Sequence, residues 1–287
     1  MIKVIFWPII GLLTVLGMVL NMAHAAQLAI VIDDFGYRQH NEMAIINLSD
    51  NITVAVLPNA THAQQIATYA HEHGNEVIIH LPMAPMGKQP LEKDTLFPDM
   101  SQTEIDRIVT DAVNKVPYAI GVNNHMGSLM TASLSGMDKV MLTLSQYDFF
   151  FLDSRTINTS KVPQAAATYH MPVLSRNIFL DDSMKEADIA AQFELAINFA
   201  RKHGHAIAIG HPYPATVNVL TQKLAQLPAD ITLVKLSQLL PLPLSLPHSL
   251  PQPTPQPTLG DILGGLKTDS AALFAEWFIQ AQSLDKY

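Results

Sequence analysis

The sequence has no cysteine, which removes disulfide bonds, thiolate nucleophiles and cysteine-ligated zinc from consideration. Basic residues are also scarce: 17 lysines and arginines stand against 25 aspartates and glutamates, and they form no cluster. The formal net charge of −8 therefore argues against a nucleic-acid partner. A glycine-rich loop for a dinucleotide or a phosphate is missing as well. The 12 histidines, in contrast, exceed ordinary usage, and their placement along the chain is informative.

The N-terminus has the three parts of a secretory signal peptide. Lys3 supplies a positive charge, Val4–Leu20 is almost wholly apolar, and Ala23-His24-Ala25 is a small-x-small cleavage site. We therefore expect residues 1–25 to be a signal peptide, cut before Ala26, and the protein to be exported to the periplasm of a Gram-negative cell. The alternative is an uncleaved segment that anchors the protein in the inner membrane, although the apolar run is short for a bilayer span.

Residues 26–240 alternate short apolar runs with amphipathic stretches, in a chain that is 48% hydrophobic. This alternation predicts an α/β domain of parallel strands joined by right-handed crossovers. Seven or eight such units suggest a closed or nearly closed barrel, but periodicity alone does not separate a barrel from an open doubly wound sheet. The predicted strands are Leu28–Ile32, Ile52–Leu57, Glu76–His80, Ala119–Asn123, Phe149–Leu152, Pro172–Leu174, Ala206–Ile209 and Ile231–Val234. The predicted helices are Ala63–His73, Glu104–Asn114, Met137–Gln146, Ala187–His203 and Ala215–Leu227.

The composition changes sharply after Leu240. Residues 241–258 are rich in proline, which predicts an extended, semi-rigid linker. Residues 259–287 carry apolar residues at helical spacing, which favours a short amphipathic C-terminal helix. Such a helix would dock on an envelope protein partner or on the barrel itself; the alternative is a disordered tail.

Two adjacent carboxylates, Asp33 and Asp34, follow the fully apolar run Leu28–Ile32. Such a run indicates a buried strand of a parallel sheet, and active sites of α/β folds are built at the carboxyl ends of these strands. Because neighbouring carboxylates are expensive to desolvate without a cation or a proton, the pair indicates a functional site. A helix N-cap is the alternative, but it explains one aspartate better than two.

Other predicted strands end in polar groups too. Three histidines, His80, His125 and His211, follow apolar runs, and the carboxyl ends of parallel strands share one face of the fold. One aspartate oxygen and two imidazoles are a natural ligand set for a divalent ion, with zinc as the first choice. The sequence therefore predicts a metal site at this face.

Five segments occur in a fixed order along the chain: Ile32–Gly36, His80–Met83, Gly121–Ser128, Asp153–Thr156 and Gly210–Pro214. The series resembles the motifs of the divergent polysaccharide deacetylases, a branch of the NodB-homology carbohydrate esterases. The resemblance runs from about residue 26 to residue 240. It implies a distorted (β/α)7 barrel and metal-dependent hydrolysis of an N- or O-acetyl group on a glycan.

The resemblance also assigns roles to residues. It makes Asp33 the catalytic base, His211 the general acid, and Asp34, His80 and His125 the metal ligands. The second histidine of the usual His-x-x-x-His pair falls on Ala84, which cannot bind a metal. His125 stands where typical members carry an Arg-Pro motif, as if the third ligand had moved there.

Further polar residues are expected to support this site. The set comprises Asn124, Asp153, Arg155, Arg176 and Asp181, and the last four are candidates for orienting His211 or holding Asp33.

The sequence is compatible with two functions. The first is a metal-dependent hydrolase that removes acetyl groups from an envelope glycan, either a polysaccharide or peptidoglycan. The second is a catalytically weak glycan-binding or scaffolding protein of the periplasm. The absence of a histidine at residue 84 and the unusual C-terminal segment favour the second function, whereas an acid and a base beside a metal site favour the first.

Overall fold

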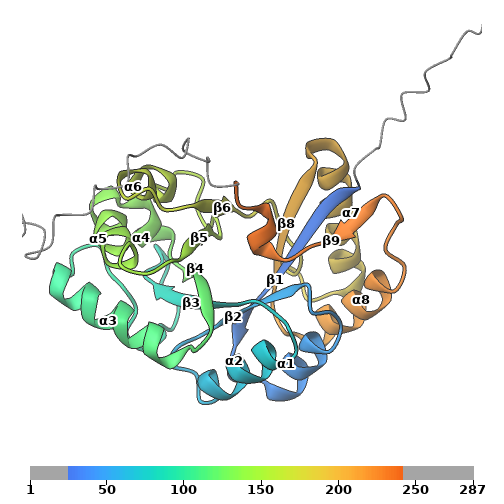
Figure 1. The fold of residues 1–287 in the computed structure, drawn as a ribbon, viewed down its shortest axis with the longest axis horizontal. Coiled ribbons are helices and arrows are strands. Elements are labelled where there is room, and N and C mark those ends of the chain that lie inside the picture. Colours follow the sequence, from blue (N-terminus) through green and yellow to red (C-terminus); the bar gives the residue numbers. More distant parts are fainter. Residues whose placement is uncertain (1–24, 242–287) are drawn as a thin grey trace, which may run out of the picture. The chain divides into compact units, whose positions relative to one another are not determined.

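The computed structural model describes residues 25–241, which form a curved parallel β-sheet surrounded by helices (Figure 1). The sheet has nine strands in the order β6-β5-β4-β3-β2-β1-β8-β7, with β9 paired to β1, and every pair is parallel. The predicted α/β barrel is therefore confirmed. The strands are β1 (Ala26–Phe35), β2 (Ile52–Val56), β3 (Val77–Met83), β4 (Ala119–Met126), β5 (Phe150–Asp153), β6 (Val173–Ser175), β7 (Ile178–Phe179), β8 (His205–Gly210) and β9 (Ile231–Leu233).

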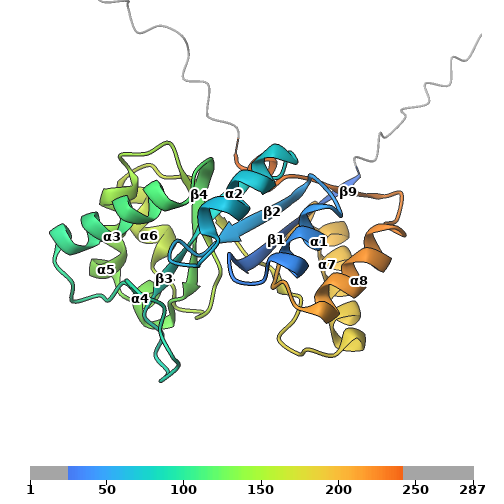
Figure 2. The same cartoon turned by 90° about the horizontal axis from the view of Figure 1, so that it is seen from below.

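The α-helices lie on the outer side of the sheet, whereas the 3-10 helix covers the amino ends of its strands (Figures 1 and 2). Among residues 25–241, none of the helices is long and apolar enough to cross a membrane. They are α1 (Gln39–Ile46), α2 (Ala63–Glu72), α3 (Gln102–Lys115), α4 (Ser128–Ala132), α5 (Leu134–Leu144), α6 (Val162–Thr168), α7 (Glu186–His203), α8 (Pro214–Leu224) and the 3-10 helix η1 (Leu236–Leu239).

The two edges of the sheet are joined by the dipeptide Arg176-Asn177, the only residues between β6 and β7. The backbone N–H of Arg176 donates to the carbonyl of Asp153 in β5, and that of Asn177 donates to the carbonyl of Ile207 in β8. Strands β6 and β7 do not pair with each other within the described sheet. Both hydrogen bonds continue existing ladders, one between β5 and β6 and the other between β7 and β8, so the chain connection itself joins the two edges at this point. This interruption of the strand pairing distorts the barrel.

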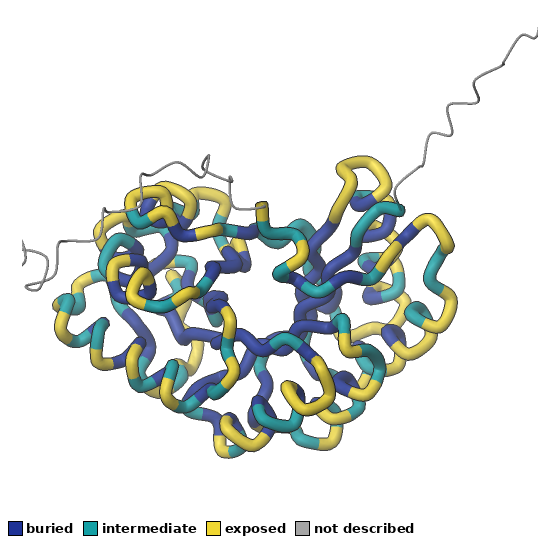
Figure 3. The backbone as a smooth tube through the Cα atoms, in the orientation of Figure 1, coloured by how far each residue is buried: buried dark blue, intermediate teal, exposed yellow. Residues whose placement is uncertain are grey.

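Alternation of side chains along the strands produces two apolar layers. One cluster packs the outer face of the strands against the helices and contains residues such as Ile30, Ile32 and Phe193. The other fills the barrel interior, with Ala29 and Val31 among its members. Most strand residues are buried, whereas most exposed residues lie on the outer surfaces of helices and in loops (Figure 3).

The interior layer is closed at the amino ends of the strands by η1. Leu236 is fully buried, and its backbone N–H donates to the Thr53 hydroxyl at the start of β2. Ser237 bonds through both its backbone N–H and its hydroxyl to the Glu76 carboxylate, just before β3. With the amino ends covered, the carboxyl ends are left as the side of the barrel that carries polar groups.

All eight predicted strands and all five predicted helices are present, with boundaries shifted by a few residues. The sequence did not predict five elements, namely β7, α1, α4, α6 and η1. Strand β7 has two residues and α4 has five, so neither is long enough to show a period. Ser101 caps α3, because its side chain accepts a hydrogen bond from the Glu104 N–H.

Residues 1–24 and 242–287 lie outside the described residues. The signal peptide, nearly all of the proline-rich linker and the C-terminal amphipathic segment therefore stay predictions.

Candidate metal centre

A β-bulge in β1 brings both aspartates to the same side of the sheet. Ile32 pairs with Val54 of β2 and Phe35 pairs with Val56, so β1 has one residue more than its partner across this interval. Asp34 adopts a left-handed backbone, with φ of 59°. In a regular strand neighbouring side chains point to opposite faces, and the bulge removes that alternation at the carboxyl end of β1.

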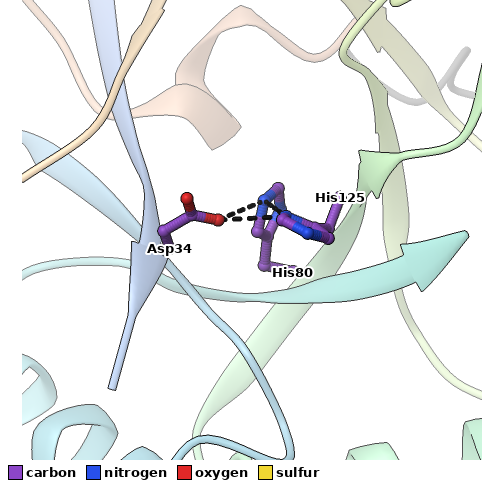
Figure 4. A group of neighbouring side chains, drawn as sticks. All are labelled: Asp34, His80 and His125. Carbon is purple, nitrogen blue, oxygen red and sulfur yellow. Dashed lines mark hydrogen bonds and ion pairs between the residues drawn. The ribbon is translucent and has the colours of Figure 1, made fainter. Parts of the chain in front are cut away.

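Asp34 meets two histidines from the neighbouring strands (Figure 4). The Asp34 Oδ1 atom lies 3.0 Å from His125 Nδ1 and 3.3 Å from His80 Nε2, and these two nitrogens are 3.1 Å apart. Strands β3 and β4 align the histidines, because His80 stands beside Asn123 and Pro82 stands beside His125 in the register. The structure thus brings together the three residues predicted as metal ligands.

The three ligand atoms fit one divalent ion. Nitrogen and oxygen ligands at 2.0–2.1 Å from a tetrahedral zinc ion lie about 3.3 Å from one another, close to the three separations found here. Asp34 Oδ1 is buried and accepts no hydrogen bond from any described residue, although the two ring nitrogens lie beside it. A cation between the three atoms would satisfy this oxygen. The Asp34 side chain remains 27% exposed, so solvent reaches one side of the group.

The electrostatics of the group also favour a cation. Burial by itself would raise the pKa of Asp34, but its contacts with His125 and His80 outweigh burial and hold that pKa far below its usual range. Burial opposes the charging of His80, yet the neighbouring carboxylates of Asp33 and Asp34 raise its pKa above the ordinary value. A positive charge is therefore stabilised between these side chains.

Asn123 connects the metal group to the second aspartate. The His80 Nδ1–H donates to Asn123 Oδ1 at 2.7 Å, and Asn123 Nδ2 donates to Asp33 Oδ1 at 2.8 Å. The first bond fixes the His80 proton on Nδ1 and leaves Nε2 free as a ligand. Asp33 is almost fully buried, and this burial raises the pKa of its carboxyl above the usual range.

His211 lies on the other side of Asp34, directly after β8. Its Nε2 is 4.0 Å from Asp34 Oδ2, while its Nδ1 is 2.8 Å from Asp181 Oδ1. Asp181 is held in turn, since its Oδ2 accepts hydrogen bonds from the His211 N–H and the Thr216 hydroxyl. Burial would lower the pKa of His211, but Asp181 outweighs burial and raises that pKa to about 9.

The sequence profile described as divergent polysaccharide deacetylase matches residues 30–240. The chain belongs to the divergent polysaccharide deacetylase family. The predicted resemblance is therefore confirmed, and with it the deacetylase-like fold.

This deacetylase-family chain has relatives in Escherichia coli and Haemophilus influenzae. The Escherichia coli protein YibQ is 58% identical over 219 residues, which cover 76% of this chain and 69% of YibQ. A protein of Haemophilus influenzae is 44% identical over 214 residues, covering 75% of this chain and 76% of the relative. A crystal structure of an Agrobacterium tumefaciens protein has the same fold, with a TM-score of 0.70 and 22% identity over 76% of this chain and 91% of that one.

Ala84 shows why this deacetylase-family chain does without the second histidine of the usual pair. Its side chain is 0% exposed, and its backbone carbonyl accepts hydrogen bonds from the N–H groups of Leu129 and Met130 in α4. Its own N–H donates to the carbonyl of Leu96. A histidine at this fully buried position would have to displace its neighbours, whereas His125 reaches the ligand group from β4.

The predicted supporting residues are distributed unevenly around the centre. Asp181 contacts His211, as described above. Asn124 points away from Asp33: its Oδ1 accepts from the Ser154 N–H and its Nδ2 donates to the Met126 carbonyl. Its neighbour Asn123, which the sequence analysis passed over, faces the site instead. Side chains two residues apart in a strand point to the same face, so a predicted ligand at His125 could have identified Asn123 as the residue that also faces the site.

Asp153, Arg155 and Arg176 form a neighbouring group at the carboxyl ends of β5 and β6. The Arg155 N–H donates to Asp153 Oδ1, and Arg176 donates through Nε to the Ser154 carbonyl and through Nη2 to the Arg155 carbonyl. None of these three side chains hydrogen-bonds to His211 or to Asp33 in the described structure. They shape the loop beside the site.

Glu42 is a second residue that the sequence analysis missed. It is fully buried in α1, and its Oε1 accepts hydrogen bonds from the successive N–H groups of Gly36, Tyr37 and Arg38. Gly36 has φ of 117°, a conformation that favours glycine. The carboxylate thereby holds the loop that follows Asp34. An acidic residue in the first turn of a helix was the signal in the sequence that could have identified Glu42.

Proposed function

We propose that the chain is a metal-dependent hydrolase that removes acetyl groups from a cell-envelope glycan. The observation that supports this proposal most strongly is the arrangement of five side chains. Asp34, His80 and His125 form a ligand triangle, and Asp33 and His211 lie beside it. A binding protein has no need of a proton acceptor and a proton donor next to a metal site.

The metal ligands in this proposal are Asp34 Oδ1, His80 Nε2 and His125 Nδ1. A divalent ion held there, with zinc as the first choice, would lower the pKa of a water molecule and polarise the acetyl carbonyl. Three protein ligands with a partly exposed side are typical of catalytic zinc sites.

Asp33 acts as the general base in this mechanism. Its raised pKa makes it a better proton acceptor than an ordinary aspartate, and the hydrogen bond from Asn123 keeps one oxygen engaged and orients the other. Asn123 is thus a positioning residue for both the base and the His80 ligand.

His211 acts as the general acid. With its pKa raised to about 9, it is protonated at neutral pH and able to give a proton to the departing amine or alkoxide. Asp181 orients the ring through Nδ1, so the proton that is transferred is the one on Nε2.

The test is acetate release by the full-length, zinc-loaded chain from a panel of peptidoglycan and acetylated polysaccharide fragments. Asp33→Asn and His211→Ala are expected to keep the fold and the zinc but to lose about 10²–10⁴-fold in turnover each. His203→Ala, at the opposite end of the barrel, is the control and should release acetate as the unmodified chain does. Glycan binding without acetate release by the unmodified chain would favour the scaffolding alternative, and undiminished turnover in both variants would overturn the assigned roles.

We also propose that residues 1–25 direct export to the periplasm and that residues 259–287 recruit an envelope protein. N-terminal sequencing of the mature chain tests the first proposal, because an intact Met1 would contradict cleavage. Loss of a co-purifying envelope protein after removal of residues 259–287 would support the second, and unchanged recovery of that protein would contradict it.

A further inference from the structure

The five arginines of the chain fall into two groups. Arg107 and Arg201 lie on α3 and α7 and are paired with carboxylates: Arg107 with Asp94 and Glu104, Arg201 with Asp230. The other three follow the carboxyl ends of strands, around the candidate metal centre, and have no carboxylate within 4.0 Å among the described residues. They are Arg38 after β1, Arg155 after β5 and Arg176 after β6.

Arg155 and Arg176 are adjacent on one side of the centre. Arg176 donates two of its five N–H groups to the Ser154 and Arg155 carbonyls. Its guanidinium lies over the Phe179 ring, 3.7 Å from the ring centroid. Ser154 connects this pair to the catalytic group, because its hydroxyl is 3.4 Å from Asn123 Nδ2. The remaining guanidinium donors have no described protein acceptor.

The Arg155 backbone is fixed while its side chain is exposed. The residue has φ of 48°, and both its N–H and its carbonyl are engaged, by Asp153 and Arg176. A non-glycine residue in this conformation costs about 1 kcal/mol or more, and such positions concentrate at functional sites. Asp182, Asp153 and Asp33 are the carboxylates that attract Arg176, and none of the three forms an ion pair with it within 4.0 Å.

Arg38 follows β1 and lies beside the loop after β8. Its guanidinium lies over the Tyr213 ring at 5.2 Å, and that ring stacks against His211 at 5.4 Å. The loop that carries Arg38 is tied to the loop after β8, since Asn41 Nδ2 donates to the Pro212 carbonyl at 2.9 Å. Cationic groups therefore lie near both the proposed acid and the proposed base.

We propose that the site takes an acetylated glycan that carries an anionic group, a carboxylate or a phosphate, next to the acetylated sugar. Arg155 and Arg176 bind the anion, because a guanidinium with unused N–H donors matches both groups in a bidentate manner. Arg38 adds attraction from the side of His211. A chain with a net charge of −8 would otherwise repel such a substrate, so a local cationic rim is needed. The inference rests on the proposed function, since the acetylated sugar is placed by the catalytic group.

The experiment measures equilibrium binding to the full-length, zinc-loaded Asp33→Asn chain. The ligands are the disaccharide of N-acetylglucosamine and N-acetylmuramic acid, its methyl ester, which lacks the charge, and N-acetylglucosamine 1-phosphate beside neutral N-acetylglucosamine. We expect each anionic ligand to bind at least about tenfold more tightly than its neutral counterpart, with a preference that shrinks as salt is added. If the preference for the acid over its methyl ester is the larger, the anion is a carboxylate. If the preference for the 1-phosphate over neutral N-acetylglucosamine is the larger, the anion is a phosphate.

Arg155→Gln is expected to remove most of this preference and Arg38→Gln a smaller part. Arg201→Gln is the matched control: it removes the same charge from a distant, paired position and should leave the preference unchanged. Equal binding of anionic and neutral ligands, or a preference that survives both Arg155→Gln and Arg38→Gln, overturns the inference.

Acetate release by the unmodified chain separates this inference from the proposed function. Release from the ester at least as fast as from the acid would leave the hydrolase standing and overturn the anionic substrate. If the acid binds in an arginine-dependent way but no ligand releases acetate, the anionic ligand stands and the proposed hydrolase is overturned.

Discussion

Replacement of His125 by alanine tests the metal centre most directly. The ligand triangle then keeps two members, Asp34 and His80, and two protein ligands rarely hold zinc. Loss of a residue that merely orients a ligand weakens binding by about 10–100-fold, so loss of a ligand should cost about 100-fold or more.

The effect can be measured as stabilisation by zinc. Free zinc at 100 times its dissociation constant stabilises the unmodified chain by about 2.7 kcal/mol. For a domain of this size, 1 kcal/mol corresponds to about 2–4 °C, so the melting temperature should rise by about 5–10 °C. After a 100-fold loss of affinity the same zinc concentration contributes only about 0.4 kcal/mol, a rise of about 1–2 °C.

The assay is a thermal melt with and without zinc, supported by metal stoichiometry after dialysis. His203→Ala, which removes an exposed histidine at the end of α7, should keep the full zinc-dependent rise. If His125→Ala keeps it as well, His125 is not a ligand and the argument from the triangle fails. If zinc and other divalent ions leave the melting temperature of the unmodified chain unchanged, there is no metal centre.

Three further substitutions test the surroundings of the centre. Asp181→Asn removes the carboxylate that raises the pKa of His211 to about 9; because the acid must be protonated, the loss of activity with rising pH should begin at lower pH, as a pH profile of acetate release will show. Ala84→His overpacks a fully buried position and should lower the free energy of unfolding by about 1–3 kcal/mol in urea, without tighter zinc binding. Glu42→Ala leaves three backbone N–H groups without their acceptor and should cost about 3 kcal/mol or more in the same assay, with a smaller loss for Glu42→Gln, which keeps a carbonyl acceptor.

For each of these substitutions, one result would contradict the expectation. An unchanged pH profile in Asp181→Asn would show that His211 is not the group that limits activity at high pH. Tighter zinc binding in a stable Ala84→His chain would mean that the second-motif position is open to a ligand. Equal stability of Glu42→Ala and the unmodified chain would mean that the loop after Asp34 does not depend on the buried carboxylate.

The sequence by itself determined the succession of strands and helices and the set of residues at the strand ends. Apolar runs such as Leu28–Ile32 are local signals, because a strand buried on both faces needs continuous apolar residues wherever it lies in the sheet. The order of Asp33-Asp34, His80, His125 and His211 was equally visible, since the carboxyl ends of parallel strands share one face. Local signals failed for β7 and α4, because two strand residues and five helical residues are too few for the hydrophobic period to repeat.

Only the tertiary structure decided which atoms meet. The bulge at Asp34 depends on the register between β1 and β2, and the choice of Asn123 over Asn124 depends on which face of β4 turns inward. The contact of Asp181 with His211 joins residues 30 positions apart, and closure through Arg176-Asn177 requires the whole sheet to have curled. These contacts are fixed by packing between distant segments, and a linear sequence contains no periodic signal for such pairings.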